Sequence, residues 1–301
     1  MSEKYIFAVL GGDRRQSIVA KKILMHGHSV RVFGLGNVAS ELVGAEICNS
    51  VEKCVECAHC ILLPLPATRD GKNLNLQAEN SDNTVALDKI IGLAHQNGNI
   101  PVLGGLIPEE LYKKAKEIKI DMIDYYSSEK LQQLNALPSA EGAIAAAMGF
   151  SDKVLEGMPV LVCGYGRIGK ILASKLRSLG AKVIVCVRRE EVVCELVMSG
   201  YEAVRINEIK ALKSAIKSSE IIFNTVPSQV FTRSVIDDCN HHPIYIEIAS
   251  SPGGIDINAA REKGIALYFL PSLPGKYAPV SAGEYIFETL KELLCERGIV
   301  L

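Results

Sequence analysis

The chain has 301 residues, of which 48% are hydrophobic and 22% are charged, and its formal net charge is -1. This balance is typical of a globular protein, and the length is enough for two domains with separate cores. The small net charge excludes a broad positive field that would attract nucleic acid or an anionic membrane. No apolar run is long enough to span a membrane, and MSEKYIFAVLGG ends in a turn rather than a signal-peptide cleavage site. We expect a cytoplasmic protein.

Nine cysteines are expected to be thiols, because a reducing cytoplasm does not sustain structural disulfides. Four lie close together, at Cys48, Cys54, Cys57 and Cys60. Their spacing resembles the start of an iron–sulfur motif, but Pro64 stands where that motif needs its fourth cysteine. The alternative is a short helix, VEKCVECAHC, ahead of the strand CILLPLP, with cysteines filling the seam between helix and sheet. The alternative is favoured, and no metal site is predicted.

The first half alternates short apolar runs with helical stretches, which is typical of a parallel sheet covered by helices. The expected strands are 5–10, 29–33, 60–65, 101–103 and 122–124. The expected helices are 14–26, 84–96 and one from about 108, where proline suits the first turn. The polar stretch PATRDGKNLNLQAENSD is predicted to be a long functional loop. A connecting helix over 127–150 is expected in two pieces, broken at Leu137-Pro138.

A second series of strands and helices begins at Pro159. Its expected elements are the strand PVLVC, the helix 167–178, the strand KVIVCV, the strands 220–224, 244–248 and 266–270, the loop PSLPGKYAPVSAG and a last helix over 283–297. The predicted fold is α/β, with two doubly wound Rossmann-like domains that have parallel sheets and are joined by connecting helices. Residues 1–135 are assigned to a substrate and catalytic domain, which the C-terminal helix 283–301 can complete. Residues 136–282 are assigned to a cofactor domain.

The strongest motif is GYGRIG, which has G-x-G-x-x-G spacing, follows an apolar strand and opens an amphipathic helix, as a dinucleotide-binding turn requires. Gly164 makes the tight turn, Gly166 lets the backbone approach a pyrophosphate, and Gly169 lets helix and strand pack closely. Amides at the start of the helix would hold the diphosphate. The other members of the turn are assigned to the same site: Tyr165, Arg167 and Ile168.

The next strand decides which nicotinamide dinucleotide fits. In NAD enzymes an acidic residue about 20 positions further on binds the ribose 2′-hydroxyl. Here Val187 occupies that position, and Arg188 and Arg189 follow it, so two guanidinium groups are available for a 2′-phosphate. Glu190 and Glu191 are either solvated or reach back to the ribose. The sequence favours NADP over NAD.

Two later strands end in motifs that are expected to border the nicotinamide, because ligands bind at the carboxyl ends of such strands. The residues assigned there are Thr225, Val226 and Pro227 in NTVP, and Ala249 and Ser250 in ASSPGG. Ordinary turns use the same residue types. Neither ASSPGG nor LPGKYAPVSAG holds the arginine or the histidine of a 2-hydroxyacid dehydrogenase, and His241 and His242 precede a strand. A simple enzyme of that class is therefore not expected.

The first strand ends in GGDRRQ, which lacks dinucleotide spacing and carries two arginines. Because arginine binds carboxylates through two parallel hydrogen bonds, this turn suits a small anion, with solvated surface arginines as the alternative. Further polar groups are Thr68 in LPLPAT and Asn135, Ser139 and Glu141 beside the connecting helix. In a two-domain dehydrogenase these side chains would face the interdomain cleft, and Thr68 and Ser139 are assigned to substrate binding.

Taken together, GGDRRQ, LPLPAT, NALPSAEGAI, GYGRIG, NTVPS, ASSPGG and LPGKYAPVSAG resemble the family of dipicolinate synthase A subunits of spore-forming bacteria over essentially the whole chain. The resemblance implies oxidation of dihydrodipicolinate to dipicolinate with NADP, together with a flavoprotein-like B subunit, in the mother cell of a sporulating bacterium. It implicates the residues Asp13, Arg15, Gln16, Ser139 and Glu141, besides the three glycines. Homo-oligomers are expected as well.

Dipicolinate is a planar ring with two carboxylates, which suits a site containing Arg15. Aromatisation removes a hydride and a proton, and Glu141 is the candidate general base, although it could instead cap the connecting helix. Two other functions remain open. One is an NADP-dependent dehydrogenase of another carboxylate or an amino acid, and the other is a non-catalytic, NADP-binding regulatory subunit.

Overall fold

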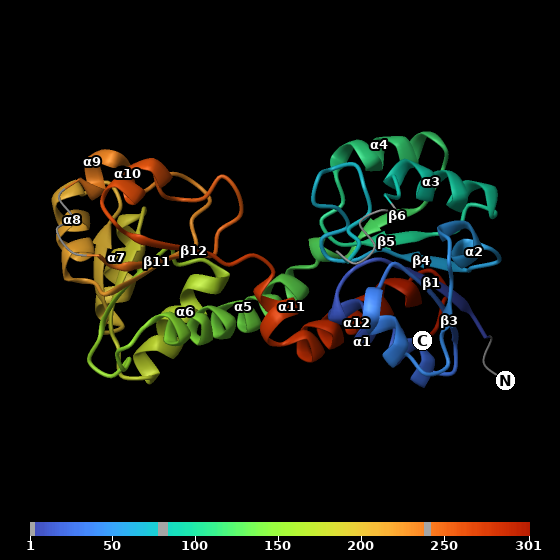
Figure 1. The fold of residues 1–301 in the computed structure, drawn as a ribbon, viewed down its shortest axis with the longest axis horizontal. Helices are drawn as coiled ribbons and strands as arrows, with labels where there is room; N and C mark the ends of the chain where they lie inside the picture. The colour runs from blue at the N-terminus through green and yellow to red at the C-terminus, as the bar shows by residue number, and fades with distance from the viewer. Residues whose placement is uncertain (1–3, 78–83, 238–241) are drawn as a thin grey trace. The chain divides into compact units, whose positions relative to one another are not determined.

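The computed structural model describes residues 4–77, 84–237 and 242–301. The chain divides into two compact units, Met1–Asn135 with Ala278–Leu301, and Ala136–Tyr277. Each unit holds a six-stranded parallel sheet with helices on both faces (Figure 1). The predicted α/β fold with two doubly wound sheets is confirmed.

The sheet of the first unit has the order β3-β2-β1-β4-β5-β6. Its strands are β1 (Ile6–Leu10), β2 (Ser29–Phe33), β3 (Glu46–Ile47), β4 (Cys60–Leu62), β5 (Val102–Gly104) and β6 (Met122–Asp124). The strand order reverses between β1 and β4, and the carboxyl ends at such a switch point are where doubly wound sheets bind ligands. The GGDRRQ segment lies at this point because it follows β1 directly.

Alternation along β1 divides the first unit into two cores, since neighbouring side chains of a strand point to opposite faces. Ala8 and Leu10 pack under α2, α3 and α4, while Phe7 and Val9 pack under α1 and α12. Figure 1 shows these two helix layers on either side of the sheet. The helical segments are α1 (Arg14–Met25), η1 (Gly36–Glu41), α2 (Val51–Val55), α3 (Leu87–Gln96), α4 (Glu109–Glu117), η3 (Tyr125–Ser127) and α12 (Pro279–Cys295).

The last helix packs closely on α1. A Cβ built on Gly283 of α12 would lie 2.7 Å from the Ile18 Cβ and 2.8 Å from the Arg15 carbonyl oxygen, so only glycine allows this approach. The C-terminal segment therefore belongs to the first unit.

The sheet of the second unit has the order β12-β11-β10-β7-β8-β9. Its strands are β7 (Pro159–Cys163), β8 (Lys182–Val187), β9 (Glu202–Arg205), β10 (Ile221–Asn224), β11 (Ile244–Glu247) and β12 (Ala266–Phe269). The helices are α5 (Glu129–Phe150), which continues across the division, α6 (Arg167–Ser178), α7 (Glu190–Met198), α8 (Ile209–Ser218), α9 (Arg233–Ile236), α10 (Ile257–Glu262) and α11 (Leu273–Tyr277).

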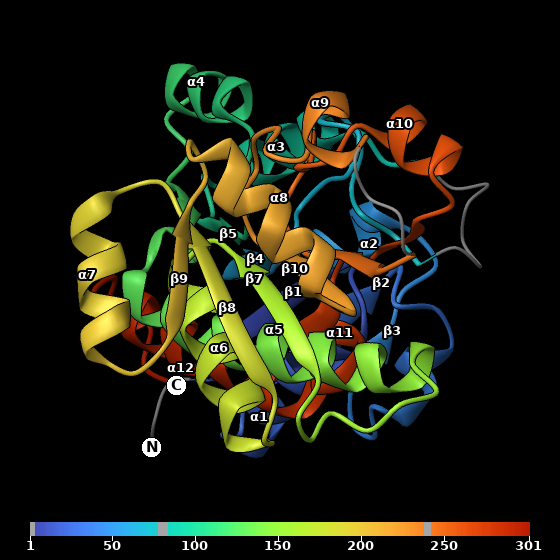
Figure 2. The same ribbon diagram turned by 90° about the vertical axis from the view of Figure 1, so that its left-hand side faces the viewer.

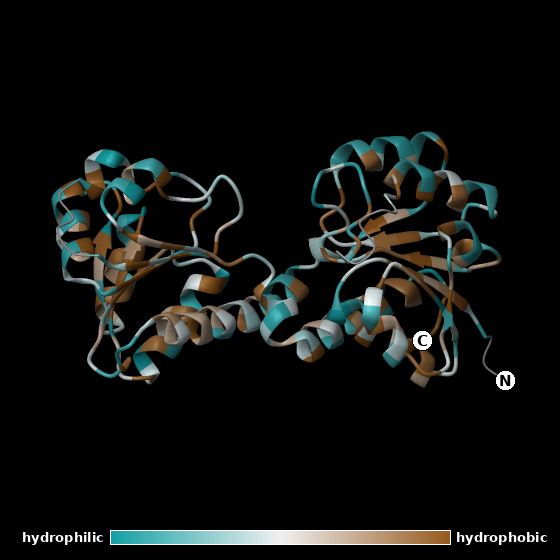
Figure 3. Ribbon diagram, viewed as in Figure 1, coloured by the Kyte–Doolittle hydropathy of each residue, from teal (hydrophilic) through white to brown (hydrophobic). Residues whose placement is uncertain are grey.

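Two apolar cores lie on opposite faces of this second sheet. Helices α5, α6 and α7 supply Ala140, Leu172 and Leu196 to one of them, and α8, α9 and α10 supply Leu212 and Val235, with further residues, to the other. Figure 3 shows the strands as the apolar interior and the outer helix faces as hydrophilic. Within the described ranges, no helix combines the length and apolarity that crossing a membrane requires.

Several predicted elements differ in the structure. The break at Leu137-Pro138 is wrong, because α5 is one helix with Pro138 inside it. Burial of Ala136, Ala140 and Ala143 on its inner side stabilises the helix against the lost proline N–H. Pro108 is the N-cap of α4 rather than a first-turn residue.

Some short elements were not predicted. Strands β3 and β9 are short and mostly outside the apolar core, and the segment PSLPGKYAPVSAG, expected as a loop, contains α11 and the start of α12. Part of the predicted long loop, and His241, lie outside the described residues.

Candidate functional site

The glycine turn of the second unit connects β7 to α6. Gly164 has a φ of +96°, and a Cβ built on it would lie 2.3 Å from the Thr225 Oγ1. A Cβ on Gly169 would lie 2.2 Å from the Gly164 carbonyl oxygen. A Cβ on Gly166, by contrast, meets no atom within 4 Å. The protein's own packing therefore requires two of these glycines, whereas the third leaves open space that a ligand can enter.

The first turn of α6 offers backbone amides at this open position. Gly166 is the N-cap of α6 and has no side chain with which to accept from the helix amides. Backbone amides and the positive end of the helix dipole are what a diphosphate requires. The predicted neighbours have different environments: Arg167 is exposed, Ile168 packs against the core, and Lys170 Nζ lies 5.4 Å from the centroid of the Tyr165 ring. The turn fits a dinucleotide, with Ile168 supporting it from the core.

The NTVP segment after β10 packs directly against the glycine turn. The Thr225 amide and hydroxyl both donate to the Cys163 carbonyl oxygen, each at 2.9 Å. The Asn224 Nδ2 donates to the Val226 carbonyl oxygen at 2.9 Å, and the Asn224 Oδ1 accepts from the Val226 amide at 3.2 Å. Thr225 and Val226 are thus held at the carboxyl edge of the sheet, next to Gly164.

A buried carboxylate, Glu247, ties this segment to ASSPGG. The residue is only 3% exposed. Its Oε1 accepts from the Asn224 Nδ2 at 2.7 Å and the Ala249 amide at 3.1 Å. Its Oε2 accepts from the Gly254 amide at 2.8 Å and the Tyr245 hydroxyl at 3.0 Å, and burial raises the pKa of that hydroxyl. Four donors satisfy the carboxylate, which fixes both segments predicted to border a nicotinamide.

Sequence reasoning missed Glu247. An acidic residue that ends an apolar strand, as in IYIE, was an available signal, because a buried carboxylate must be hydrogen-bonded or paired. Its partner Asn224 lies 23 residues earlier in the chain, at the end of the adjacent strand.

The carboxyl end of β8 carries the residues expected to choose between NAD and NADP. Val187 is buried, and Arg188 and Arg189 are exposed. Within the part of the chain that the structure describes, neither arginine side chain has a hydrogen bond or an ion pair. Arg189 is also the N-cap of α7 and makes no side-chain capping bond. Two unpaired guanidinium groups therefore stand at the start of a helix.

In the first unit, the GGDRRQ turn is tied together by its own side chains. Asp13 caps α1 by accepting from the Arg15 amide at 3.0 Å, and its carboxylate pairs with the Arg15 Nη2 at 2.8 Å. Arg15 also donates to the Leu65 carbonyl oxygen, and the Gln16 Nε2 donates to the Leu62 carbonyl oxygen at 3.1 Å. Arg15 and Gln16, both predicted to bind substrate, thus also attach the turn to the segment around β4, and Asp13 holds Arg15 in place.

The two arginines of this turn differ in how exposed their side chains are. Arg15 is 5% exposed, and its Nη1 makes no hydrogen bond to any described residue. Arg14 is exposed. One nitrogen of the buried arginine therefore remains available to a ligand.

The remaining predicted polar residues differ in their environments. The Thr68 hydroxyl donates to the Asp70 Oδ1 at 3.0 Å and accepts from the Gly71 amide. Hydrogen bonds from nearby amides hold the pKa of Asp70 below its usual range. Ser139 is buried in α5. Glu141 is exposed and pairs with the Lys175 Nζ at 2.9 Å. Because α5 is continuous, Glu141 lies inside the helix and does not cap it.

The cysteine cluster has the predicted helix-to-strand geometry. Cys54 is in α2, Cys60 begins β4, and both are fully buried, which raises the pKa of their thiols well above the usual value. Cys57, between them, is exposed. Among the described residues, no three cysteine, histidine or carboxylate side chains are arranged to hold a metal ion.

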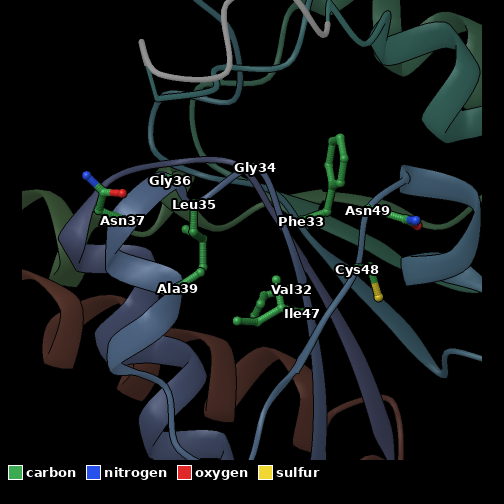
Figure 4. Close-up of a pocket in the computed structure, with 10 residues that line it drawn as sticks. All are labelled: Val32, Phe33, Gly34, Leu35, Gly36, Asn37, Ala39, Ile47, Cys48 and Asn49. Carbon is green, nitrogen blue, oxygen red and sulfur yellow. The ribbon is translucent and has the colours of Figure 1, made fainter.

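A cavity of about 450 Å³ opens at the carboxyl end of β2. Residues 32–37, 39 and 47–49 line it, with Val32 and Ile47 at its apolar base in Figure 4. It does not include Arg15, Gln16 or Thr68. The cavity is therefore separate from the predicted substrate residues.

Both halves of the chain are similar to known protein families. Residues 6–126 match the family model for the N-terminal domain of the dipicolinate synthase A subunit, and residues 138–270 match "S-adenosyl-L-homocysteine hydrolase, NAD binding domain". The A subunit of dipicolinate synthase from Bacillus subtilis (strain 168) is 27% identical over 289 residues, which cover 96% of this chain and 95% of that protein.

Two solved structures of dipicolinate synthase A subunits are also similar to this chain. The crystal structure of the dipicolinate synthase A subunit from Bacillus halodurans has a TM-score of 0.83 at 26% identity and covers 97% of each chain. That of its Bacillus subtilis counterpart has a TM-score of 0.82 at 27% identity, over 98% of this chain and 97% of that chain. A transhydrogenase from Sinorhizobium meliloti has a TM-score of 0.68 at 15% identity, over 97% and 93% of the two chains, and so shares the fold alone.

Proposed function

Because the chain belongs to the family of dipicolinate synthase A subunits, we propose that it is an oxidoreductase of dipicolinate synthesis. In the proposed reaction, dihydrodipicolinate loses a hydride to NADP⁺ and a proton to a base. The products are dipicolinate, NADPH and H⁺. The proposal includes a second, flavoprotein-like B subunit that is needed for full activity. The single observation that carries it is the glycine turn, in a chain similar over 96% of its length to that family.

The second unit is proposed to hold the dinucleotide. A nicotinamide cofactor supplies the hydride acceptor when it is bound. The space beside Gly166 and the uncapped amides of α6 suit the diphosphate, because a Cβ would fill that space and a side-chain cap would occupy the amides. Thr225 and Ser250, on segments fixed through Glu247, are proposed to position the nicotinamide end.

NADP is the proposed acceptor rather than NAD. Arg188 and Arg189 follow a buried valine where an NAD site would carry an acidic residue, and both are free to bind a 2′-phosphate. A phosphate that accepts from two guanidinium groups is held by charge-assisted bonds, which are stronger than neutral ones.

The GGDRRQ turn of the first unit is proposed to bind a substrate carboxylate through the Arg15 Nη1. Asp13 then acts as a positioning residue, since it pairs with the Nε and Nη2 of the same side chain. For the proton we propose Glu141, an exposed carboxylate held by Lys175. Thr68, Gln16 and Ser139 are proposed as polar neighbours of the substrate.

The deciding experiment follows NADPH absorbance and dipicolinate formation in the same sample, without oxygen, starting from dihydrodipicolinate and NADP⁺. Oxygen is excluded because air oxidation of the substrate would form dipicolinate without NADPH. Equal molar amounts of both products, formed faster with the B subunit, are expected. Another carboxylate or amino acid as the better substrate would favour a different dehydrogenase. Binding of NADP(H) with no turnover of any of these substrates, with the B subunit present, would favour a regulatory protein.

Two matched variants test the substrate assignment. Arg15→Lys keeps the charge and loses the guanidinium fork, and should lower kcat/KM for dihydrodipicolinate roughly 10-fold or more, since a hydrogen bond to a charged group contributes about 1.5–3 kcal/mol. NADP(H) binding should be unchanged. Arg14→Ala removes the exposed neighbour and should have the smaller effect. A larger effect of Arg14→Ala would assign the substrate carboxylate to Arg14 instead.

A third variant tests the proposed base. Glu141→Gln should lower kcat without weakening NADP(H) binding.

A further inference from the structure

The edge strand β9 brings a third arginine to the two at the end of β8. The strands pair in parallel, and Arg205 of β9 is the partner of Val187. The Ile206 amide donates to the Val187 carbonyl oxygen at 2.8 Å, so the chain leaves both strands at the same edge of the sheet. Figure 2 shows β8 and β9 side by side, with α7 next to β9. Arg205 is therefore one strand away from Arg188 and Arg189.

The Arg205 side chain belongs to the sheet face that α7 covers. Residues two apart in a strand share a face, and Ala203 packs in the same core as Val187 and the apolar residues of α7. At the end of the strand, the Arg205 Nη1 donates to the Glu190 Oε2 at 3.0 Å, and the Glu208 Oε1 lies 3.8 Å away. Because Glu190 is the first residue of α7, the guanidinium group lies at the start of that helix.

Arg205 is incompletely paired in this position. Its Nε is buried and has no hydrogen-bond partner among the described residues, which is destabilising for a charged donor. The amides at the start of α7 are not capped by the N-cap side chain either, because Arg189 makes no capping bond. An anion at the start of α7 would supply acceptors to these amides and to the half-exposed guanidinium group of Arg205.

We propose that Arg205 is a third arginine of the 2′-phosphate site and that Glu190 holds it until the phosphate replaces the carboxylate. This inference rests on the proposed binding of NADP. Glu190 meets Arg205 through one guanidinium nitrogen, whereas a phosphate offers three acceptor oxygens to Arg205, Arg188 and Arg189 together. A ribose without the phosphate has no charge with which to displace Glu190. Arg205 therefore acts on the choice between NADP(H) and NAD(H).

The test is a pair of titrations, with NADPH and with NADH, of the wild-type protein and its variants. Arg205→Ala should weaken NADPH binding about 10-fold or more, since it removes charge-assisted bonds, and should leave NADH binding nearly unchanged. Arg205→Lys should lie between it and the wild type. Glu190→Gln should strengthen NADPH binding several-fold because the competing carboxylate is gone. Arg177→Ala is the matched control, since the Arg177 side chain, from α6, donates to the carbonyl oxygen of Ser199 at the other end of α7, at 2.8 Å.

Each outcome decides the inference. If Arg205→Ala weakened the binding of NADPH and of NADH equally, the role of Arg205 would be purely structural and the inference would be overturned. Unchanged NADPH binding by this variant would overturn it as well. If the alanine variant unfolds, competition of NADPH binding by adenosine 2′-monophosphate in Arg205→Lys and Glu190→Gln gives the same comparison. Failure of the wild type to bind either dinucleotide would overturn the proposed function as well. If the wild type binds NADPH and neither Arg205→Lys nor Glu190→Gln changes its affinity, only the role of Arg205 would be overturned.

Discussion

Two glycines of the same turn, Gly166 and Gly169, should differ in what an added methyl group changes: stability for one of them and dinucleotide binding for the other. A Cβ at Gly169 would lie 2.2 Å from the Gly164 carbonyl oxygen, where ordinary contacts begin at 3.4 Å. Helix and turn must therefore separate by about 1 Å, since the Cβ is bonded directly to the helix backbone and the oxygen is part of the backbone of the turn. A Cβ at Gly166 meets nothing within 4 Å, and its φ of -81° is ordinary for alanine. Gly169→Ala should act on folding, and Gly166→Ala on the ligand.

The expected magnitudes follow from this geometry. Overpacking costs about 1–3 kcal/mol, so Gly169→Ala should lower the Tm by roughly 3–10 °C. Gly166→Ala should lower the free energy of unfolding by about 1 kcal/mol, because alanine is a poorer N-cap than glycine. It should nevertheless weaken binding of both NADPH and NADH, because the methyl group occupies the space proposed for the diphosphate. Thermal unfolding and dinucleotide titration of the two variants measure these effects separately.

The wild-type protein and Gly200→Ala serve as controls. Gly200 has a φ of +78° and open space around it, so its alanine variant should lose some stability through backbone strain and no affinity. Unchanged dinucleotide binding by a folded Gly166→Ala would refute the reasoning, because the open space would then not be the diphosphate site. A fully stable Gly169→Ala would show that the turn can move aside.

Replacing both Arg188 and Arg189 by alanine should cost on the order of 2–4 kcal/mol in NADPH binding and much less in NADH binding; equal wild-type titrations with the two cofactors would contradict the NADP assignment. Elemental analysis should find zinc and iron well below one atom per chain, and one metal per chain that is lost in Cys57→Ser would overturn the packing role of the cysteines. Burial lowers the pKa of His28 from 6.5, so the stability it supports is complete above pH 6.5 and is lost as the pH falls through its folded value. His28→Gln should therefore flatten the fall in Tm between neutral and mildly acidic pH, and parallel curves would exclude His28 as a cause.

The sequence predicted the sheets well where strands are buried on both faces. Such strands are continuous apolar runs, and the segments IFAVL, PVLVC and KVIVCV form β1, β7 and β8. The glycine turn was equally visible, since its spacing follows from backbone geometry. Strand β9, with the sequence EAVR, lies at the sheet edge and is mostly half-buried, so it carries no apolar run. Missing this strand meant missing Arg205.

Contacts between distant segments could not be predicted from spacing. Glu247 meets Asn224 only because β10 and β11 are adjacent and end in register. Arg15 meets the Leu65 carbonyl oxygen 50 residues away because β1 and β4 are neighbours. A motif therefore identifies which residue types gather at a strand end, and the sheet order decides which of them touch.

The two arginines Arg15 and Arg205 show why residue type alone leaves a site ambiguous. A guanidinium group has five N–H donors, and a buried one must find acceptors for them. In Arg15 the Nε and Nη2 bond to Asp13 and Leu65, and the Nη1 is the one guanidinium nitrogen without a partner among the described residues. In Arg205 the Nη1 is used by Glu190 and the buried Nε has no acceptor among the described residues. Once internal partners are subtracted, the donors that remain suit the anion proposed at each strand end, a substrate carboxylate in the first unit and a 2′-phosphate in the second.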